Sequence, residues 1–595
     1  MSNHTFDGTF LEVSGGMIGK RSAQMPLYDV GNVFAYVLKP GSFHAQLAEA
    51  ADRLFKDEDF AAFYSTGTGR PSVPPSKLAL IYLMQAEAQV SDLEAADRTG
   101  CDLRWAAVLR IVAGASFCAK STLQLFRAHL VLHPEVEAIF AASINEAKRA
   151  GLLKGQALKI AIDTKPIRGR GSVQDTYNLV ATGIRQVARE LAKIAGQQPD
   201  EYLRSNDLAR YTEPSVKGSA DIDWSDEEAR CRVLTEIVVD AKRLLSIAGS
   251  HATDAVRTAA KLLEQLMLQD IETKKNDDGS EQSTIIDGTA KGRIPSATDP
   301  EVRHGRKSSS KRFNGHKADI AVDEDSGTIV GFNVLAGDAA DASGALELVD
   351  QVEHNTDMTV EETTADCAYG GGPTRQQFEG ADRVLLAKVP QECSRNGLYP
   401  KSAFTIDLEK HTVTCPAGNT IGKYSTDKTG KHYSFGSRCS ACPLKSLCTT
   451  AKSGRTITVH PQEAVIQEAR RYQKTPEGRA HLRRRFIVEH RLARLGQLGI
   501  SQARYKGRKK TRIQLMISCA LANFRLAWNH TARLEAKSDL WTPCFALIWW
   551  LTVVYRLVRT PIQATAPFVR QNTRKLPSTM RLAEMQQKPA FRLCF

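Results

Sequence analysis

ALKIAIDTKPI, residues 157–167, is the segment of this sequence that says most about its fold class. Its apolar residues Leu158, Ile160 and Ile162 recur at every second position and are followed by Asp163. This pattern predicts a sheet strand with Asp163 at its carboxyl end, where ligands gather in α/β sheets. A lone Asp there can also form a turn or a cap, so the position alone assigns no function.

The residues that follow predict the rest of a mixed sheet. They indicate a hairpin that turns at 325–327, a helix, a strand that ends at Asp366 before a glycine-rich exit, and one more strand. Joined by crossover helices, these elements make an α/β fold. The segments are HKADIAVDEDSGTIVGFNVLAG (316–337), ASGALELVDQV (342–352), TVEETTADCAYGG (359–371) and RVLLAKV (383–389), with polar loops expected at 274–283 and 303–313.

Helical patterns surround this sheet. Residues 71–135 show apolar residues at helical spacing, and Ser91 with Glu94 forms a capping box that begins a helix. This unit could bind DNA as a helix-turn-helix or serve only as a packing module. We also expect helices from the first strand to about residue 275 and from 476 to 530. The apolar run at 540–558 contains Pro543 and Arg556 and has no second span beside it, which favours a buried or partly exposed helix over a membrane span.

Charge is distributed unevenly along the 595 residues. The net charge is +14, yet the segment from residue 451 onward has 28 Lys and Arg against 7 Asp and Glu. A basic segment of this kind suits a phosphate backbone, although it can also be a solvated face. The first residues lack a basic stretch followed by an apolar one, so we expect no secretory leader and a reducing cytoplasm for the twelve cysteines.

Glu489 is conspicuous by its surroundings. It is the single acid among eleven Lys and Arg in residues 481–512, and helical spacing places it on the same stripe as Phe486 and Leu492. An inward carboxylate there needs a partner, which Arg485, four residues earlier, supplies in a purely structural reading. The alternative is catalysis, because two-metal phosphodiester chemistry needs carboxylates that converge from separate elements.

Four cysteines follow the predicted sheet in the pattern C-x23-C-x2-C-x5-C. Thiolates in a loop-rich segment can close a tetrahedral zinc site, and the C-x2-C pair is its most telling part. Reduced, unliganded thiols and disulfides are the alternatives, and His411, His432 and Cys393 are spare ligands. The four are Cys415, Cys439, Cys442 and Cys448.

Four blocks, in order, resemble the DDE transposases of bacterial insertion sequences: ALKIAIDTKPI, RIPSATDPEVRHGRKSSSKRFNGHKADIAVDEDSG, TTADCAYGG and RRRFIVEHRLARLGQLGISQARYKGRKK. Residues 71–135 resemble the N-terminal domain of these proteins, and related transposases have similar cysteines before the Glu helix. The resemblance implies a ribonuclease-H-like mixed sheet flanked by helices, with the first acid on the first strand, the second after the fourth and the third on a later helix. The catalytic acids, which would bind Mg²⁺ or Mn²⁺, are then Asp163, Asp366 and Glu489, with Arg485 in support.

The resemblance also implies a domain order. It begins with an all-α DNA-binding domain, continues with a catalytic domain interrupted by a helical and a Cys-rich insertion that could hold structural zinc, and ends in a basic and apolar tail. The ranges are 1–150 for the first, 151–180 and 300–530 for the catalytic domain, 181–299 and 390–455 for the insertions, and 531–595 for the tail.

The implied partners are the terminal inverted repeats of the element and its target DNA. Cleavage would expose 3′-hydroxyls that attack the target, with two ends held by at least a dimer, in the cytoplasm and at the nucleoid. Some relatives have Lys seven residues after the Glu. Position 496 is Gly here, and Arg494 or the basic cluster is a candidate substitute. This departure keeps a decayed, DNA-binding derivative open, beside another ribonuclease-H-like nuclease. The expected DNA-binding residues are Arg504, Lys506, Arg508, Lys509 and Lys510.

Overall fold

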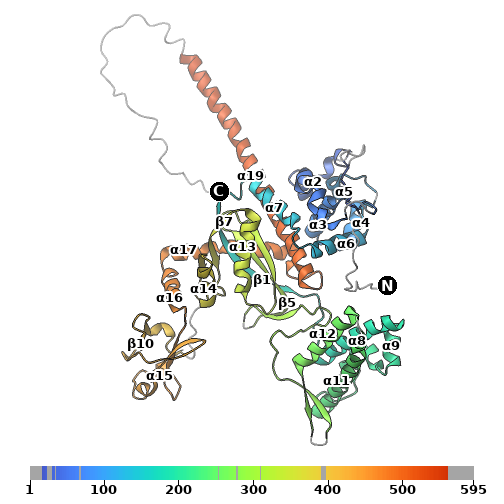
Figure 1. Cartoon of the computed structure of the whole chain (residues 1–595). Helices are drawn as coiled ribbons and strands as arrows, with labels where there is room; N and C mark the ends of the chain where they lie inside the picture. The colour runs from blue at the N-terminus through green and yellow to red at the C-terminus, as the bar shows by residue number, and fades with distance from the viewer. Residues whose placement is uncertain are drawn as a thin grey trace. The chain divides into compact units, whose positions relative to one another are not determined.

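The computed structural model describes residues 17–22, 30–33, 35–65, 69–114, 116–251, 253–276, 279–308, 310–389 and 397–559. It is a mixed α/β structure, as the sequence predicts (Figure 1). The described residues fall into two compact units that divide between His530 and Thr531. The sheet and the candidate site belong to the first unit.

The central sheet has six strands. Five follow the order β4-β5-β1-β7-β8, and β6 also pairs with β5, along the residues of β5 that β4 leaves unpaired. β1 is antiparallel to β5 and parallel to β7, which is parallel to β8. The predicted hairpin is confirmed, since β5 and β6 pair antiparallel around a turn in which Gly327 has φ +74°. The strands are β1 (Ala157–Arg168), β4 (Arg303–Arg306), β5 (Arg312–Asp323), β6 (Ile329–Ala336), β7 (Thr359–Ala365) and β8 (Leu385–Ala387).

The two faces of this sheet follow from strand alternation. Ile162 on β1 pairs with Ala321 on β5, which pairs with Gly331 on β6, and a Cβ at Gly331 would meet Leu348 and Val352. That face is therefore covered by α13 (Ala345–Thr356), which follows the short η4 (Asp341–Gly344). The opposite face of β1 carries Asp163 and meets α18 (Phe486–Leu495).

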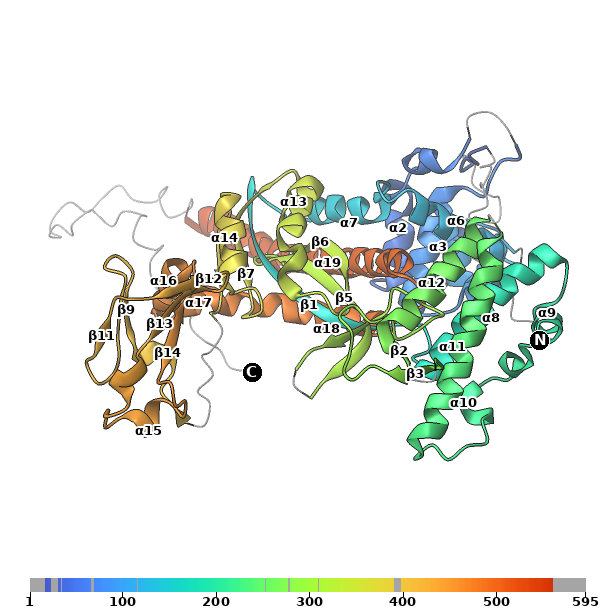
Figure 2. The ribbon, with the colours of Figure 1, turned by 60° about the horizontal axis from the view of Figure 1, so that its bottom comes forward.

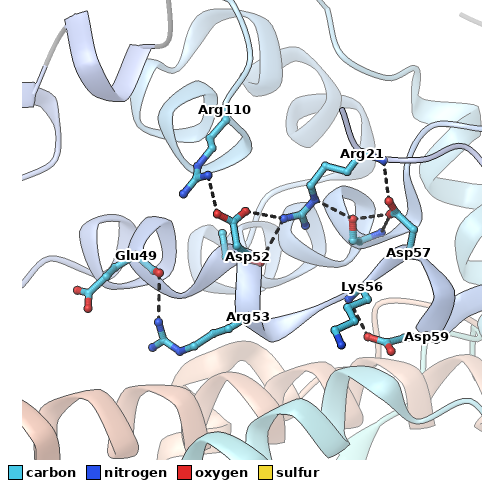
Figure 3. Close-up of polar contacts among 10 residues, drawn as sticks. Arg21, Glu49, Asp52, Arg53, Lys56, Asp57, Asp59 and Arg110 are labelled. Carbon is cyan, nitrogen blue, oxygen red and sulfur yellow. Dashed lines mark hydrogen bonds and ion pairs between the residues drawn. The ribbon is translucent and has the colours of Figure 1, made fainter. Parts of the chain in front are cut away.

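The expected N-terminal helices are present. The Ser91 hydroxyl accepts from the Glu94 N–H at 3.1 Å and so caps α4, as predicted. Buried Asp57 at the start of η2 links the segment before α1 to α3. It accepts from the Arg21 N–H at 2.7 Å and from the Ser76 hydroxyl at 2.5 Å (Figure 3). The helices are α1 (Val30–Val33), η1 (Ala35–Val37), α2 (Phe43–Leu54), η2 (Asp57–Phe63), α3 (Pro75–Ala88), α4 (Asp92–Cys101), α5 (Leu103–Leu109), α6 (Lys120–Leu132) and α7 (Ala138–Arg149).

A helical segment follows β1 and has a core of its own. Its long helix α8 begins at the capping residue Asp175 and ends at Gly196, which has φ +67°. The loop expected at 274–283 is wrong at both ends, because these belong to β2 (Ile271–Lys275) and β3 (Glu281–Ile285), a hairpin whose Thr273 and Ser283 hydroxyls are 3.0 Å apart. The loop expected at 303–313 is likewise shorter, since β4 and the start of β5 occupy its two ends. The helices are α8 (Thr176–Ala195), α9 (Pro199–Ser205), η3 (Ala209–Thr212), α10 (Val216–Ser219), α11 (Glu227–Gly249) and α12 (Asp254–Asp270).

The cysteine-containing segment is built on two small sheets, visible together in Figure 2. Phe404, Val413, Tyr433 and Phe435 are among the residues of its separate core. It comprises η6 (Lys401–Ala403), β9 (Thr405–Asp407), β10 (Thr412–Thr414), β11 (Thr420–Ile421), β12 (Ser425–Asp427), β13 (Gly430–Ser434), η7 (Gly436–Cys439), α15 (Lys445–Cys448) and β14 (Thr456–Val459).

Helices complete the described chain. They are α14 (Gly372–Gly380), α16 (Glu463–Tyr472), α17 (Pro476–Arg484), α18, the π-helical turn η8 (Gly496–Ile500) and α19 (Arg508–Arg559), which includes the apolar run at 540–558. Within the part of the chain that the structure describes, no helix is long and apolar enough to cross a membrane.

One hydrophobic core joins the N-terminal helices, the sheet and the start of α19. Buried Asn523 on α19 shows how closely they meet. Its side-chain amide donates to the Ile329 carbonyl at 2.8 Å and accepts from the Ile329 N–H at 2.9 Å, and it also donates to the Ser143 hydroxyl on α7 at 3.2 Å. The N-terminal helices are thus packed into the same core as the sheet.

Candidate active site

Asp163 lies within β1 and not at its carboxyl end, because the strand continues to Arg168 beside β5. The expected position at the strand end is therefore wrong, although the strand itself is confirmed. Its carboxylate is mostly buried and accepts from the Thr164 N–H at 2.7 Å. Burial first, and then the charges of nearby Asp366 and Asp341, raise the pKa of Asp163 to about 6, although the Thr164 N–H and Arg485 oppose the rise.

Arg485 connects Asp163 to Glu489. It lies at the junction of α17 and α18, where its guanidinium donates to Asp163 Oδ2 at 3.2 Å and to Glu489 Oε1 at 2.5 Å. The ion pair with Glu489 that the spacing allowed is present. Two acids separated by more than three hundred residues thus share one cation.

Glu489 is placed differently from the sequence expectation. Its side chain is 52% exposed and Phe486 is 61% exposed, so the carboxylate does not lie on a buried stripe. The buried residues of α18 are Val488, Leu492 and Leu495. Helical spacing alone could not say which side of this short helix meets the sheet.

Asp366 directly follows β7, as predicted. Because β7 runs parallel to β1 with Ala161 opposite Thr364, continued register brings Asp366 next to Asp163. Its carboxylate accepts from the Ala368 N–H at 2.8 Å, which fixes the turn at the strand end.

Further acidic and phenolic groups surround this site that the sequence analysis did not name. Asp319 on β5 is fully buried, and neither of its oxygens has a hydrogen-bond partner among the described residues. Asp341 accepts from Lys317 Nζ at 2.7 Å and from the Thr164 hydroxyl at 2.9 Å. Tyr369 is buried among these acids. Burial, followed by the neighbouring carboxylates, holds the pKa values of Asp319 and Tyr369 well above their usual ranges. The sequence did offer one sign of Asp319, because it is an acid within the apolar strand segment ADIAV (318–322).

The donor chemistry fits a divalent cation. Carboxylate oxygens suit Mg²⁺. Asp163 is mostly buried and lies near the charges of Asp366 and Asp341, so a bound cation would offset negative charge there. Nevertheless, no three His, Cys, Asp or Glu side chains of the described residues already lie close enough together to hold a metal ion. With Arg485 between Asp163 and Glu489, closing the acids around a metal requires side-chain movement.

The five expected DNA-binding residues differ in their surroundings. Lys506, Lys509 and Lys510 are exposed, and the described residues give them no hydrogen-bond or ion-pair partner. Arg508 pairs with Glu301 at 3.5 Å, while Arg504 donates to the Val90 carbonyl. Arg504 therefore also connects the segment before α19 with the N-terminal helices.

A cleft of about 690 Å³ lies beside Arg504, between α3, α4 and α6 on one side and residues 498–518 on the other. The guanidinium of Arg127 is 4.0 Å from the ring centre of Tyr505 and pairs with Asp92 at 2.6 Å. Four cations against a single acid line this cleft, namely Lys120, Arg127, Arg170 and Arg504 against Asp92.

The four cysteines line one small cavity of about 20 Å³ and are free thiols. Burial raises the pKa of Cys448, and the other three cysteines add to this effect, although Arg455 opposes it. The thiols are neighbours without forming a closed metal shell. His432 pairs with Asp427 at 2.8 Å and His411 is near Lys431, while Cys393 lies outside the described residues.

Comparison with protein families gives two matches. A transposase DDE domain matches residues 414–527, which include the four cysteines, Arg485 and Glu489. A transposase domain known as DUF772 matches residues 33–129, the N-terminal helices. No curated protein and no solved structure matches the chain.

Proposed function

We propose that this chain, which its two domain matches identify as an insertion-sequence DDE transposase, binds the ends of its element, cuts the DNA there and joins the 3′-hydroxyls to a target. The catalytic residues in this proposal are Asp163, Asp366 and Glu489. The observation that carries it is the shared contact of Arg485 with Asp163 and Glu489. That contact puts the third acid, from a helix late in the chain, at the strand that carries the first.

We further propose a ribonuclease-H-like catalytic domain. β1 is the first strand and carries the first acid. β4 pairs only with the first four residues of β5, so we do not count it among the main strands of the sheet. The main strands in chain order are then β1, β5, β6, β7 and β8, and β7, which precedes the second acid, is the fourth. We propose with it the domain ranges that the resemblance implies, with residues 1–150 as the DNA-binding part and the cysteine segment as a structural zinc site.

The chain's own groups have distinct tasks in this proposal. A pair of divalent metal ions, held by Asp163, Asp366 and Glu489, would activate the attacking oxygen and stabilise the leaving one. Asp163 and Asp366 are held in place by backbone N–H donors, from Thr164 and Ala368. Arg485 offsets the charge of two acids and positions Glu489 beside β1.

DNA would follow the basic surfaces of the same unit. The exposed lysines 506, 509 and 510 can contact phosphates without reading sequence. The cleft beside Arg127 offers both cations and the Tyr505 ring, a combination that suits nucleic acid. Holding two ends together implies at least a dimer on DNA.

The test is a reaction with Mg²⁺ or Mn²⁺ on a plasmid that carries the DNA flanking both sides of the gene. We expect nicks at the element ends and joined products in a second, target plasmid. Binding without any nicking would support the decayed, DNA-binding alternative. Cleavage of RNA–DNA hybrids or junctions without joining would support another nuclease of this fold.

A further inference from the structure

Lys165 is a cation beside the acids that the proposed mechanism leaves unused. It lies on β1 two residues after Asp163, so the two side chains emerge on the same face of the sheet, the face that α18 meets. Lys165 is half-buried, and its ammonium makes no hydrogen bond or ion pair with any residue that the structure describes. A partly buried charge of this kind calls for a counter-ion.

Gly496 leaves room for this ammonium. A Cβ atom at position 496 would lie 3.2 Å from Lys165 Nζ and 3.6 Å from the Ser501 hydroxyl. Position 496 directly follows the helix of Glu489, so the tip of Lys165 lies where that helix ends. A long side chain at 496 and the present position of Lys165 therefore exclude each other.

The surroundings of Lys165 favour an anion. Lys165 is half-buried, and Lys307 on the loop between β4 and β5 is a second positive charge near its ammonium. Arg494, a candidate substitute for a cation at 496, instead donates to Gln497 Oε1 at 3.1 Å. Two lysines thus lie near one another next to the acidic site, and neither is paired with a carboxylate among the described residues.

We propose that Lys165, in the space left by Gly496, binds a phosphate oxygen of the DNA strand that is cut at Asp163, Asp366 and Glu489. The inference deepens the proposed function and rests on it. It also explains why position 496 can be Gly where some relatives have Lys. Lys165 on β1 supplies the positive charge that the end of α18 lacks. Lys165 would position the phosphate, and Lys307 would add to the attraction.

The test combines loss with rescue. Lys165→Met keeps the length of the side chain and removes its charge, so we expect plasmid nicking to fall at least about tenfold, the worth of one charge-assisted hydrogen bond. Because a long side chain at 496 needs the space that Lys165 fills, the rescue uses the shorter alanine at 165. Lys165→Ala should lose nicking in the same way, Lys165→Ala with Gly496→Lys should recover most of that loss, and Lys165→Ala with Gly496→Met should not. Exposed Lys261 on α12 is the matched control, and Lys261→Met should nick like the wild type.

A second readout does not depend on cleavage. Binding of a labelled DNA duplex, measured over a series of salt concentrations in the Glu489→Gln background, should lose about one unit of its logarithmic salt dependence in Lys165→Met.

Wild-type nicking and an unchanged salt dependence in Lys165→Met would overturn the phosphate site while leaving the proposed function intact. A wild type that cuts no DNA, yet shows the lost salt dependence in Lys165→Met, would instead contradict the proposed function alone. If nicking is lost, Gly496→Lys does not restore it and the salt dependence is unchanged, Lys165 has a structural role and does not bind phosphate.

Discussion

At the scale of single residues, Asp163 is a proposed catalytic acid whose burial lowers the stability of the folded protein at neutral pH. Its pKa of about 6 in the folded protein exceeds the ordinary value of 3.8, so the folded state binds the proton more tightly. The free energy of unfolding should therefore fall as the pH rises from about 4 to about 6. Buried charge of this kind is often retained where catalysis needs it.

Asp163→Asn should consequently stabilise the metal-free protein while abolishing cleavage. The expected gain in free energy of unfolding at neutral pH is up to about 3 kcal/mol, from the cited pKa difference. Denaturant unfolding in the presence of a chelator measures it. The gain should shrink as the pH falls through 6 towards 4, and a variant less stable than the wild type at neutral pH would contradict this reading.

Single residues were unequally predictable from the sequence. Glu489 stood out as a lone acid in a basic segment, and its pairing with Arg485 followed from helical spacing. Its exposure did not, because only packing decides which side of α18 meets the sheet. Asp163 and Asp366 acquired a role from family resemblance. Lys165 carried no signal, since its proposed role depends on the space beside Gly496, more than three hundred residues away.

At the scale of elements, strands and helices with strong periodicity were predictable. The β5–β6 hairpin, α13 and β7 follow directly from alternation, helical spacing and turn residues. The β2–β3 hairpin was missed, because KKNDDGSEQS reads as polar loop and the only apolar residues of the two strands, Ile271 and Ile285, lie at their outer ends. Position along a strand also escaped prediction, since β1 extends past Asp163 by pairing with β5.

The cysteine segment provides the prediction at this scale. If Cys415, Cys439, Cys442 and Cys448 hold zinc, the purified protein should contain about one zinc per chain by atomic absorption. Cys442→Ser should lower this content and make the segment sensitive to proteolysis, because metal binding adds to a small core. Cys231→Ser, at a cysteine on α11 of the separate helical segment, is the control. Zinc-free wild type with unchanged protease resistance would favour reduced, unliganded thiols.

At the scale of the whole molecule, the three largest hydrophobic cores of the described residues belong to different parts of the chain. The N-terminal helices share one with the sheet and α19, whereas the helical and cysteine segments have their own. The domain order implied by sequence resemblance did not reveal this shared core, because contacts between 43–147 and 513–528 depend on the folded chain. If the N-terminal helices bind DNA as proposed, this shared core would hold them beside the proposed catalytic acids without a flexible linker.

Asn523→Leu tests that shared core. The substitution leaves the Ile329 N–H and carbonyl unpaired in a buried position, so we expect a loss of about 2 to 4 kcal/mol in the free energy of unfolding. Calorimetry should show a lower Tm for one transition that includes both the N-terminal helices and the sheet. Separate melting of the N-terminal helices would contradict a common core.

The most direct test of the catalytic assignment is nicking by Glu489→Gln beside Glu477→Gln. Glu477 is an exposed acid of the preceding helix α17, so the two variants make the same chemical change within one basic segment. With Mg²⁺ and the plasmid that carries the flanking DNA, we expect Glu489→Gln to cut none of it while binding DNA as well as or slightly more tightly than the wild type. Glu477→Gln should cut normally. Wild-type nicking by Glu489→Gln would contradict the assignment of Asp163, Asp366 and Glu489 as the catalytic acids.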